Sequence, residues 1–177
     1  MISTISHIRF DPASPSRDDL NIEDIAHALS LITRANGHFD CFYSVACHCI
    51  NCAKEAKSRG YTARVQLLCL LHDAAEAYIG DMTRPLKKKM PVFSEIEKKY
   101  QDIIFPAFVS EALTEADFEK AKNVDDCLLY HEFLTFNGEA LFENAPKINI
   151  SVRDGITDFK QTKEEFLNLY KELRDEL

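Results

Sequence analysis

The chain has 177 residues, of which 46% are hydrophobic and 28% are charged, and its formal net charge is -8. This length suits a single domain that buries about two-thirds of the surface of its unfolded chain. The acidic balance argues against a nucleic-acid polymer as a partner, because binding along a phosphate backbone requires clustered Lys and Arg. The sequence contains no long apolar stretch and no secretion signal, so we expect a cytoplasmic protein that does not contact a membrane.

The composition favours helices over sheets. The chain has only five glycines and six prolines, and few of its segments alternate apolar and polar residues as strands do. Residues 1–19, which contain Pro12 and Pro15, are expected to be irregular. The helices that we predict, in chain order, lie at about 22–34, 41–59, a segment through His72 that ends near Gly80, 91–105, 115–136 and 160–177. The fold predicted from this pattern is all-α, a single-domain helical bundle over residues 1–177.

The last predicted helix is amphipathic, with Phe166, Leu169, Tyr170 and Leu173 along one face. An amphipathic helix that is exposed at the surface can form an interface between subunits. A homodimer is therefore one expectation for the assembly.

The segment from Leu67 to Asp81 is apolar nearly all the way round, and its only imidazole or carboxyl side chains before Gly80 are those of His72, Asp73 and Glu76. A carboxylate buried in such a helix costs several kcal/mol unless it is paired or bound to a cation. Glu76 follows His72 by four residues and Asp73 by three, so the three side chains leave neighbouring parts of one face. A metal ion explains all three, and other helices must complete its ligand set.

A basic segment, residues 83–89, follows this helix directly. Charge runs are usually solvated loops. The alternative is that Arg84 and Lys87 contact a phosphate, for which arginine offers a bidentate fork. The sequence leaves both interpretations open.

Cysteines suggest a second metal hypothesis. Cys47, His48, Cys49 and Cys52 share one short segment. On a helix, however, Cys47 and Cys49 point about 200° apart, and buried cysteine is ordinarily a small apolar residue. We therefore expect reduced, structural thiols rather than disulfides or a zinc site. His48 taken alone fits a hydrogen-bonded helix histidine as well as a metal ligand.

In their order along the chain, these segments resemble the HD-domain metal-dependent phosphohydrolases, in particular a prophage-associated branch related to the bacterial 5'-deoxynucleotidases of the YfbR type. His72-Asp73 is similar to the paired motif that gives this superfamily its name. The segments 42–48, 73–78, 80–87 and 124–132 resemble the motifs of the branch, and the resemblance covers about residues 20–135. A tandem of ordered motifs is far more specific than one dipeptide.

The resemblance implies one divalent metal held by four ligands, His48, His72, Asp73 and Asp125. From the residues alone, Asp126 is an equal candidate for the last position, although Leu129 and Glu132 fit the family spacing when counted from Asp125. Two imidazoles and two carboxylates suit manganese, cobalt, iron, nickel or magnesium.

The remaining site residues are assigned by chemistry and by the resemblance together. Glu76 is placed either to transfer a proton or to form an ordinary ion pair, and the resemblance names Asp81 as the other acid or base. Arg34 would hold the phosphate together with Lys87 and Arg84. His38 either lines the site or ends the loop after Gly37.

The function expected is the removal of phosphate from a small nucleotide, most simply a nucleoside 5'-monophosphate. The alternatives are hydrolysis of another phosphoester, pyrophosphorylated or cyclic, a nucleotide sensor without catalysis, and a helical interaction protein in which the cysteines and charges are structural. The deoxynucleotidases carry a tryptophan directly after the substrate arginine, where this chain has Ala35. The resemblance therefore does not fix the sugar.

Overall fold

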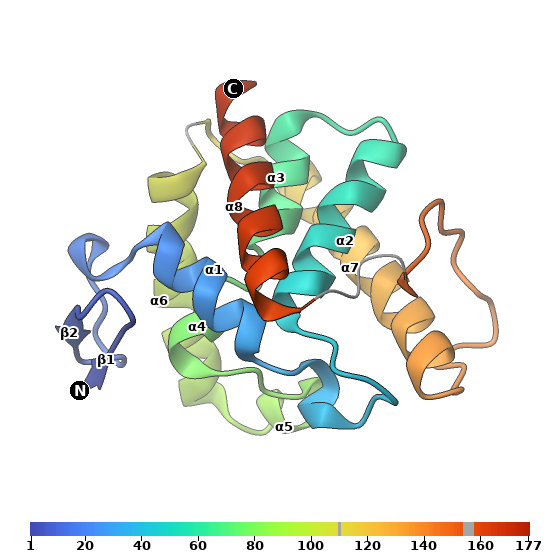
Figure 1. The fold of residues 1–177 in the computed structure, drawn as a ribbon, viewed down its shortest axis with the longest axis horizontal. Coiled ribbons are helices and arrows are strands. Elements are labelled where there is room, and N and C mark those ends of the chain that lie inside the picture. Colours follow the sequence, from blue (N-terminus) through green and yellow to red (C-terminus); the bar gives the residue numbers. More distant parts are fainter. Residues whose placement is uncertain (110, 154–157) are drawn as a thin grey trace.

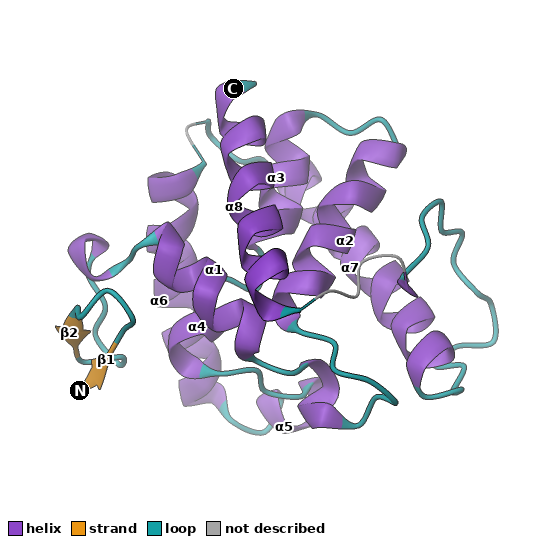
Figure 2. Ribbon diagram, in the orientation of Figure 1, coloured by secondary structure: helices purple, strands orange, loops and turns teal. Residues whose placement is uncertain are grey.

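Helices make up most of the computed structural model, which describes residues 1–109, 111–153 and 158–177 (Figures 1 and 2). The helices are α1 (Ile22–Leu31), α2 (Val45–Ser58), α3 (Ala63–Leu71), α4 (Glu76–Ile79), α5 (Arg84–Lys87), α6 (Pro91–Phe108), α7 (Glu115–Phe136) and α8 (Phe159–Asp175). The predicted all-α bundle is confirmed.

The centre of the molecule is formed by α2 and α3, which pack against each other and against α7. Every residue of α3 from Val65 to Leu71 is buried, because this helix is covered by α2, α7 and α8. A helix that is apolar all round is stable only in such a central position. The polar residues that follow α3 therefore emerge inside the bundle rather than at its surface.

Helix α8 packs against α1, α2 and α3 (Figure 1). Phe166 and Leu173 are fully buried there. The bundle therefore covers part of the face that was predicted to form an interface, whereas Leu169 and Tyr170 on that face stay partly exposed.

Two helix ends differ from the prediction. The second helix begins at Val45 rather than near Cys41, because the Ser44 side chain caps it by accepting from the backbone N–H of Cys47. The first helix ends at Leu31, three residues early. The chain then extends and enters a 3-10 turn over residues 34–37, which positions Arg34.

The helix predicted through His72 is interrupted. It ends as α3 at Leu71, and a tighter turn over residues 72–75 leads into α4. Within this turn, backbone N–H groups bond to carbonyls three residues back, as Glu76 does to Asp73 at 2.9 Å. Gly80 then ends α4 with a positive φ of 80°. The motif is thus a turn at the end of a buried helix.

Three further differences lie outside the centre. A two-stranded sheet, β1 (Ile2–Ser3) with β2 (Arg9–Phe10), occupies the N-terminal region that was predicted to be irregular. The basic segment forms α5, and α6 continues past Pro106 to Phe108. Among the described residues, no helix is both long and apolar enough to cross a membrane.

Candidate active site

Two histidines and two aspartates from three parts of the bundle meet at one point. His48 is a fully buried residue of α2, His72 and Asp73 directly follow α3, and Asp125 belongs to α7. The Nε2 atoms of the two histidines lie 3.2 Å apart. Asp125 Oδ1 lies 3.2 Å from Nε2 of His48 and 3.8 Å from Nε2 of His72. Asp73 Oδ2 lies 3.2 Å from Nε2 of His72.

These distances suit a divalent metal. Imidazole and carboxylate ligands lie about 2.0–2.2 Å from such an ion, so two at right angles are about 3 Å apart. Nδ1 of His48 donates to Glu132 at 2.6 Å, and Nδ1 of His72 donates to the carbonyl of Cys69 at 2.7 Å. These bonds leave the Nε2 lone pairs directed at the common point, as in metal-binding histidines. The four side chains therefore form a donor set that can hold one divalent cation.

Asp125, rather than its neighbour Asp126, faces the two histidines. The carboxylate of Asp126 accepts instead from the side chains of Arg84 and Lys122. The structure thus separates two residues that helical spacing alone did not distinguish.

Two thiols also lie near the histidines. The ligand atoms of Cys52 and of Cys49 each form a group within 4.8 Å, the first with His48 and His72, the second with His72 and Asp73. Cys52 Sγ is 3.5 Å from Nε2 and 3.9 Å from Nδ1 of His48, so it lies beside the ring rather than in line with the Nε2 lone pair. Burial raises the pKa of Cys49 to about 11 and the pKa of Cys52 well above its usual value. Nitrogen and oxygen donors therefore fit the site better than thiolates do.

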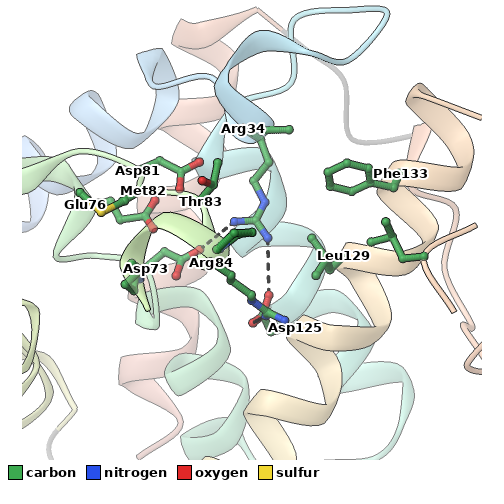
Figure 3. Close-up of a pocket in the computed structure, with 14 residues that line it drawn as sticks. Arg34, Asp73, Glu76, Asp81, Met82, Thr83, Arg84, Asp125, Leu129 and Phe133 are labelled. Carbon is green, nitrogen blue, oxygen red and sulfur yellow. Dashed lines mark hydrogen bonds and ion pairs between the residues drawn. The ribbon is translucent and has the colours of Figure 1, made fainter. Parts of the chain in front are cut away.

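Arg34 is a largely buried cation of the site, with 11% of its side chain exposed. Its guanidinium lies 3.3 Å from Asp73 and 3.5 Å from Asp125 (Figure 3). It also lies 3.3 Å from Glu132. Burial alone would lower the pKa of Arg34, but the surrounding carboxylates outweigh it and raise the pKa well above its usual value. The side chain therefore carries its charge throughout the physiological range.

Glu132 is the site residue whose role the sequence analysis missed. It is fully buried, and its Oε1 accepts from Nδ1 of His48 and, at 3.0 Å, from the hydroxyl of Tyr43. Its Oε2 accepts from Nε of Arg34 at 3.3 Å. Burial opposes ionisation, but His48 and Arg34 lower the pKa of Glu132. A glutamate among apolar residues, seven positions after Asp125 on one helix, is the signal that could have revealed it.

Two further carboxyl groups lie beside Asp73. Glu76 is almost completely buried, and its Oε2 has no hydrogen-bond partner among the described residues. Burial, followed by the charges of Asp73 and Asp81, raises the pKa of Glu76 well above its usual value. Burial also raises the pKa of Asp81, although Arg34 opposes the shift. Within the described ranges Glu76 forms no ion pair, so proton transfer is the better-supported of its two expected roles.

These groups open into a pocket of about 360 Å³, a size suited to a small molecule (Figure 3). One side of the pocket is charged and the other is apolar. Its lining residues are Arg34, Ala35, Asp73, Glu76, Asp81, Met82, Thr83, Arg84, Pro85, Lys87, Asp125, Leu129, Phe133 and Leu141.

The basic segment contributes two cations to the pocket. Arg84 donates to Asp125 Oδ2 and to Asp126 Oδ1, at 2.6 Å in each case. Lys87 donates to Glu97 at 2.6 Å. Because both cations line the pocket, contact with a bound anion is favoured over the interpretation as a solvated loop.

His38 is not brought to the site. Its side chain is exposed and lies outside the pocket lining. Its backbone N–H donates to the carbonyl of Ala35 at 3.0 Å, at the end of the 3-10 turn. This geometry favours the alternative in which His38 ends the loop after Gly37.

Comparison with known proteins agrees with this geometry. The model of the HD domain family matches residues 30–133, more than half of the chain. The chain is 37% identical over 103 residues to the uncharacterized protein YfdR of Escherichia coli K12, which covers 58% of this chain and 55% of that protein. It is 42% identical over 88 residues to an uncharacterized protein of Rhodobacter capsulatus, covering 47% of this chain and 44% of that protein. The chain thus spans about half the length of the curated relatives it matches. It belongs to the HD domain family.

Proposed function

We propose that this protein is a metal-dependent phosphohydrolase that removes phosphate from a nucleoside 5'-monophosphate, with His48, His72, Asp73 and Asp125 as the metal ligands. The observation that carries the proposal is the convergence of these four donors, two of which, Asp73 and Asp125, line a pocket that also contains cations and protonatable carboxyl groups. A binding protein for nucleotides would need the cations but not the four-donor site.

A divalent cation bound by these ligands would act as a Lewis acid on the phosphoryl group and lower the pKa of a water molecule beside it. Arg34 and Lys87 offset the charge of the phosphate, and Arg34 is fixed for this task because Glu132 and Asp73 hold its guanidinium. Arg84, at the mouth of the pocket, adds a second guanidinium fork.

Proton transfer falls to Glu76 and Asp81. Both line the pocket, and burial raises the pKa of each carboxyl group toward the range in which a side chain can give and take a proton near neutrality. The unpartnered Oε2 of Glu76 is free to bond to water or to the leaving oxygen. We assign Glu76 the proton transfer to or from water, and Asp81 the protonation of the leaving group.

Two observations support a nucleotide as the substrate. The motifs resemble those of YfbR-type 5'-deoxynucleotidases, and the pocket is lined by both charged and apolar side chains. Ala35 directly follows Arg34 at the pocket lining, so a small side chain occupies the position of the tryptophan in those enzymes. We therefore propose no preference between ribose and deoxyribose.

Phosphate release from nucleoside 5'-mono-, di- and triphosphates, with added manganese or cobalt, tests this function. The wild type should hydrolyse monophosphates, and Asp73→Asn should lower the rate about a thousandfold or more. Asp102→Asn, at an exposed carboxylate of α6, is the matched control and should keep full activity. Phosphate release from di- or triphosphates alone would show that the substrate is a polyphosphate rather than a monophosphate. Binding of metal and nucleotide without phosphate release would favour a sensor.

A further inference from the structure

The pocket has two sides of different chemistry. Glu76, Asp81 and Asp73 lie on one side of Arg34 in Figure 3, and Leu129 and Phe133 lie on the other. All five line the same pocket. The proposed reaction uses only the charged side, so the apolar side needs its own explanation.

We propose that the apolar side, formed by Leu129, Phe133 and Leu141, is the binding site for the nucleobase, and that it accepts purines and pyrimidines without distinguishing them by side-chain hydrogen bonds. This inference rests on the proposed function, since it concerns the substrate of the same site. It adds the residues that determine which phosphate esters are accepted.

The spacing of residues along α7 separates the charged side of the pocket from the apolar side by a distance that a nucleotide can span. Asp125, Leu129 and Phe133 follow one another at intervals of four residues, so they share one face of the helix. With a rise of 1.5 Å per residue, Phe133 lies about 12 Å along the axis from Asp125. A nucleotide with its phosphate at the level of Asp125 would extend its sugar past Leu129 and its base to Phe133.

The ring of Phe133 is held in place but not enclosed. It makes a near-perpendicular contact with Phe39, with ring centroids 5.2 Å apart and an interplanar angle of 82°. Phe133 is nevertheless only partly buried, whereas Phe136 on the next turn is 2% exposed and belongs to the core. A fixed aromatic ring that lines a pocket is a platform on which a base can stack.

Leu129 and Leu141 complete the apolar side. Both are partly exposed and line the pocket, Leu129 from α7 and Leu141 from the segment after it. Ala35 is the neighbouring lining residue from the 3-10 turn. None of these described side chains offers a donor or acceptor to a base edge, so recognition relies on stacking and burial, which every base allows.

The test compares a nucleoside 5'-monophosphate with ribose 5-phosphate, which keeps the phosphate and sugar but lacks the base. Phe133→Ala should lower kcat/KM for the nucleotide about tenfold through a higher KM, and should change kcat/KM for ribose 5-phosphate less than twofold. Leu134→Ala, at the exposed neighbour on α7, is the matched control and should leave both values unchanged. Adenosine, guanosine, cytidine and uridine monophosphates should differ by less than about tenfold in the wild type.

Phe133 also contacts Phe39, so Phe133→Leu and Leu141→Ala are measured beside Phe133→Ala in case the latter unfolds. An equal loss for both substrates in these variants, or no loss for the nucleotide, would overturn the base site.

The proposed hydrolase function can be wrong while the base site is right, and a binding measurement distinguishes these two cases. If the wild type hydrolyses neither substrate, calorimetric binding replaces turnover. Tighter binding of the nucleotide than of ribose 5-phosphate, reduced about tenfold by Phe133→Leu or Leu141→Ala, would support the base site without the hydrolase. Equal binding of the two by the wild type would overturn it.

Discussion

Two groups of charged side chains at the site are under different physical constraints: the floor, His48 and Glu132, which are buried behind the pocket lining, and the rim, Arg84 and Lys87, which belong to that lining. On the floor, His48 and Glu132 are fully buried and bonded to each other at 2.6 Å. At the rim, Arg84 and Lys87 sit on the short helix α5 and pair with carboxylates near solvent. Buried polar groups must keep their partners, whereas exposed ion pairs contribute about 0–1 kcal/mol and exchange easily. The floor is thus suited to hold a metal, and the rim to release its partners for a substrate.

The largest effect on stability and on metal affinity is expected from Glu132→Gln, on the floor. The amide replaces a carboxylate that serves His48, Tyr43 and Arg34 together. We expect the free energy of unfolding to fall by about 3–5 kcal/mol, and metal affinity to fall about 10–100-fold because His48 loses its orienting acceptor. Urea unfolding and a cobalt titration measure the two effects.

Glu139→Gln is the control for this change, since Glu139 is exposed just after α7. A drop in stability without any drop in metal affinity would show that Glu132 supports the fold but not the metal site.

The second prediction is that the stability of the protein depends on pH through Glu76, which lines the pocket. Burial raises the pKa of Glu76 in the folded protein. The folded state therefore holds this proton more tightly than the unfolded chain, and stability is lost as the pH rises from the ordinary glutamate pKa through the raised one. Glu76→Gln removes this loss.

With a chelator present, Glu76→Gln should therefore gain stability relative to the wild type as the pH rises above about 4.3, the ordinary glutamate pKa, as measured by urea midpoints. The gain should be absent in Glu95→Gln, at an exposed position of α6. A constant difference between Glu76→Gln and the wild type at every pH would contradict the raised pKa.

The smallest effect on stability is expected at the rim, from Arg84→Ala. Its ion pairs with Asp125 and Asp126 lie at a half-exposed guanidinium, so the free energy of unfolding should change by no more than about 1 kcal/mol. The KM of the nucleotide should rise several-fold if Arg84 exchanges these partners for phosphate.

Lys122→Ala is the matched control, because Lys122 also pairs with Asp126 but does not line the pocket. An equal rise of KM in both variants would assign the effect to the carboxylates rather than to the arginine.

The sequence predicted the helical fold and the polar motif because both depend on local patterns. Apolar residues all round His72 and Asp73 indicate a buried helix whatever its neighbours are. The helix ends at Leu31 and Leu71 were missed, since they depend on backbone bonds to other segments and on a local tightening of the turn.

The other features that the sequence did not predict depend on contacts between distant segments. Glu132 gains its role from His48, Tyr43 and Arg34, of which the nearest in the chain, His48, lies 84 residues earlier. The choice between Asp125 and Asp126 needed the rotation of α7, which sequence spacing does not give.

Metal binding tests the central claim most directly, through calorimetric titration of cobalt into the wild type, Asp125→Asn and Asp126→Asn. The two substitutions are chemically identical and adjacent, but only Asp125 faces the histidines. We predict one bound ion in the wild type and in Asp126→Asn, and an affinity at least about 100-fold weaker in Asp125→Asn. Equal affinities in all three proteins, or no binding by the wild type, would contradict a metal centre formed by His48, His72, Asp73 and Asp125.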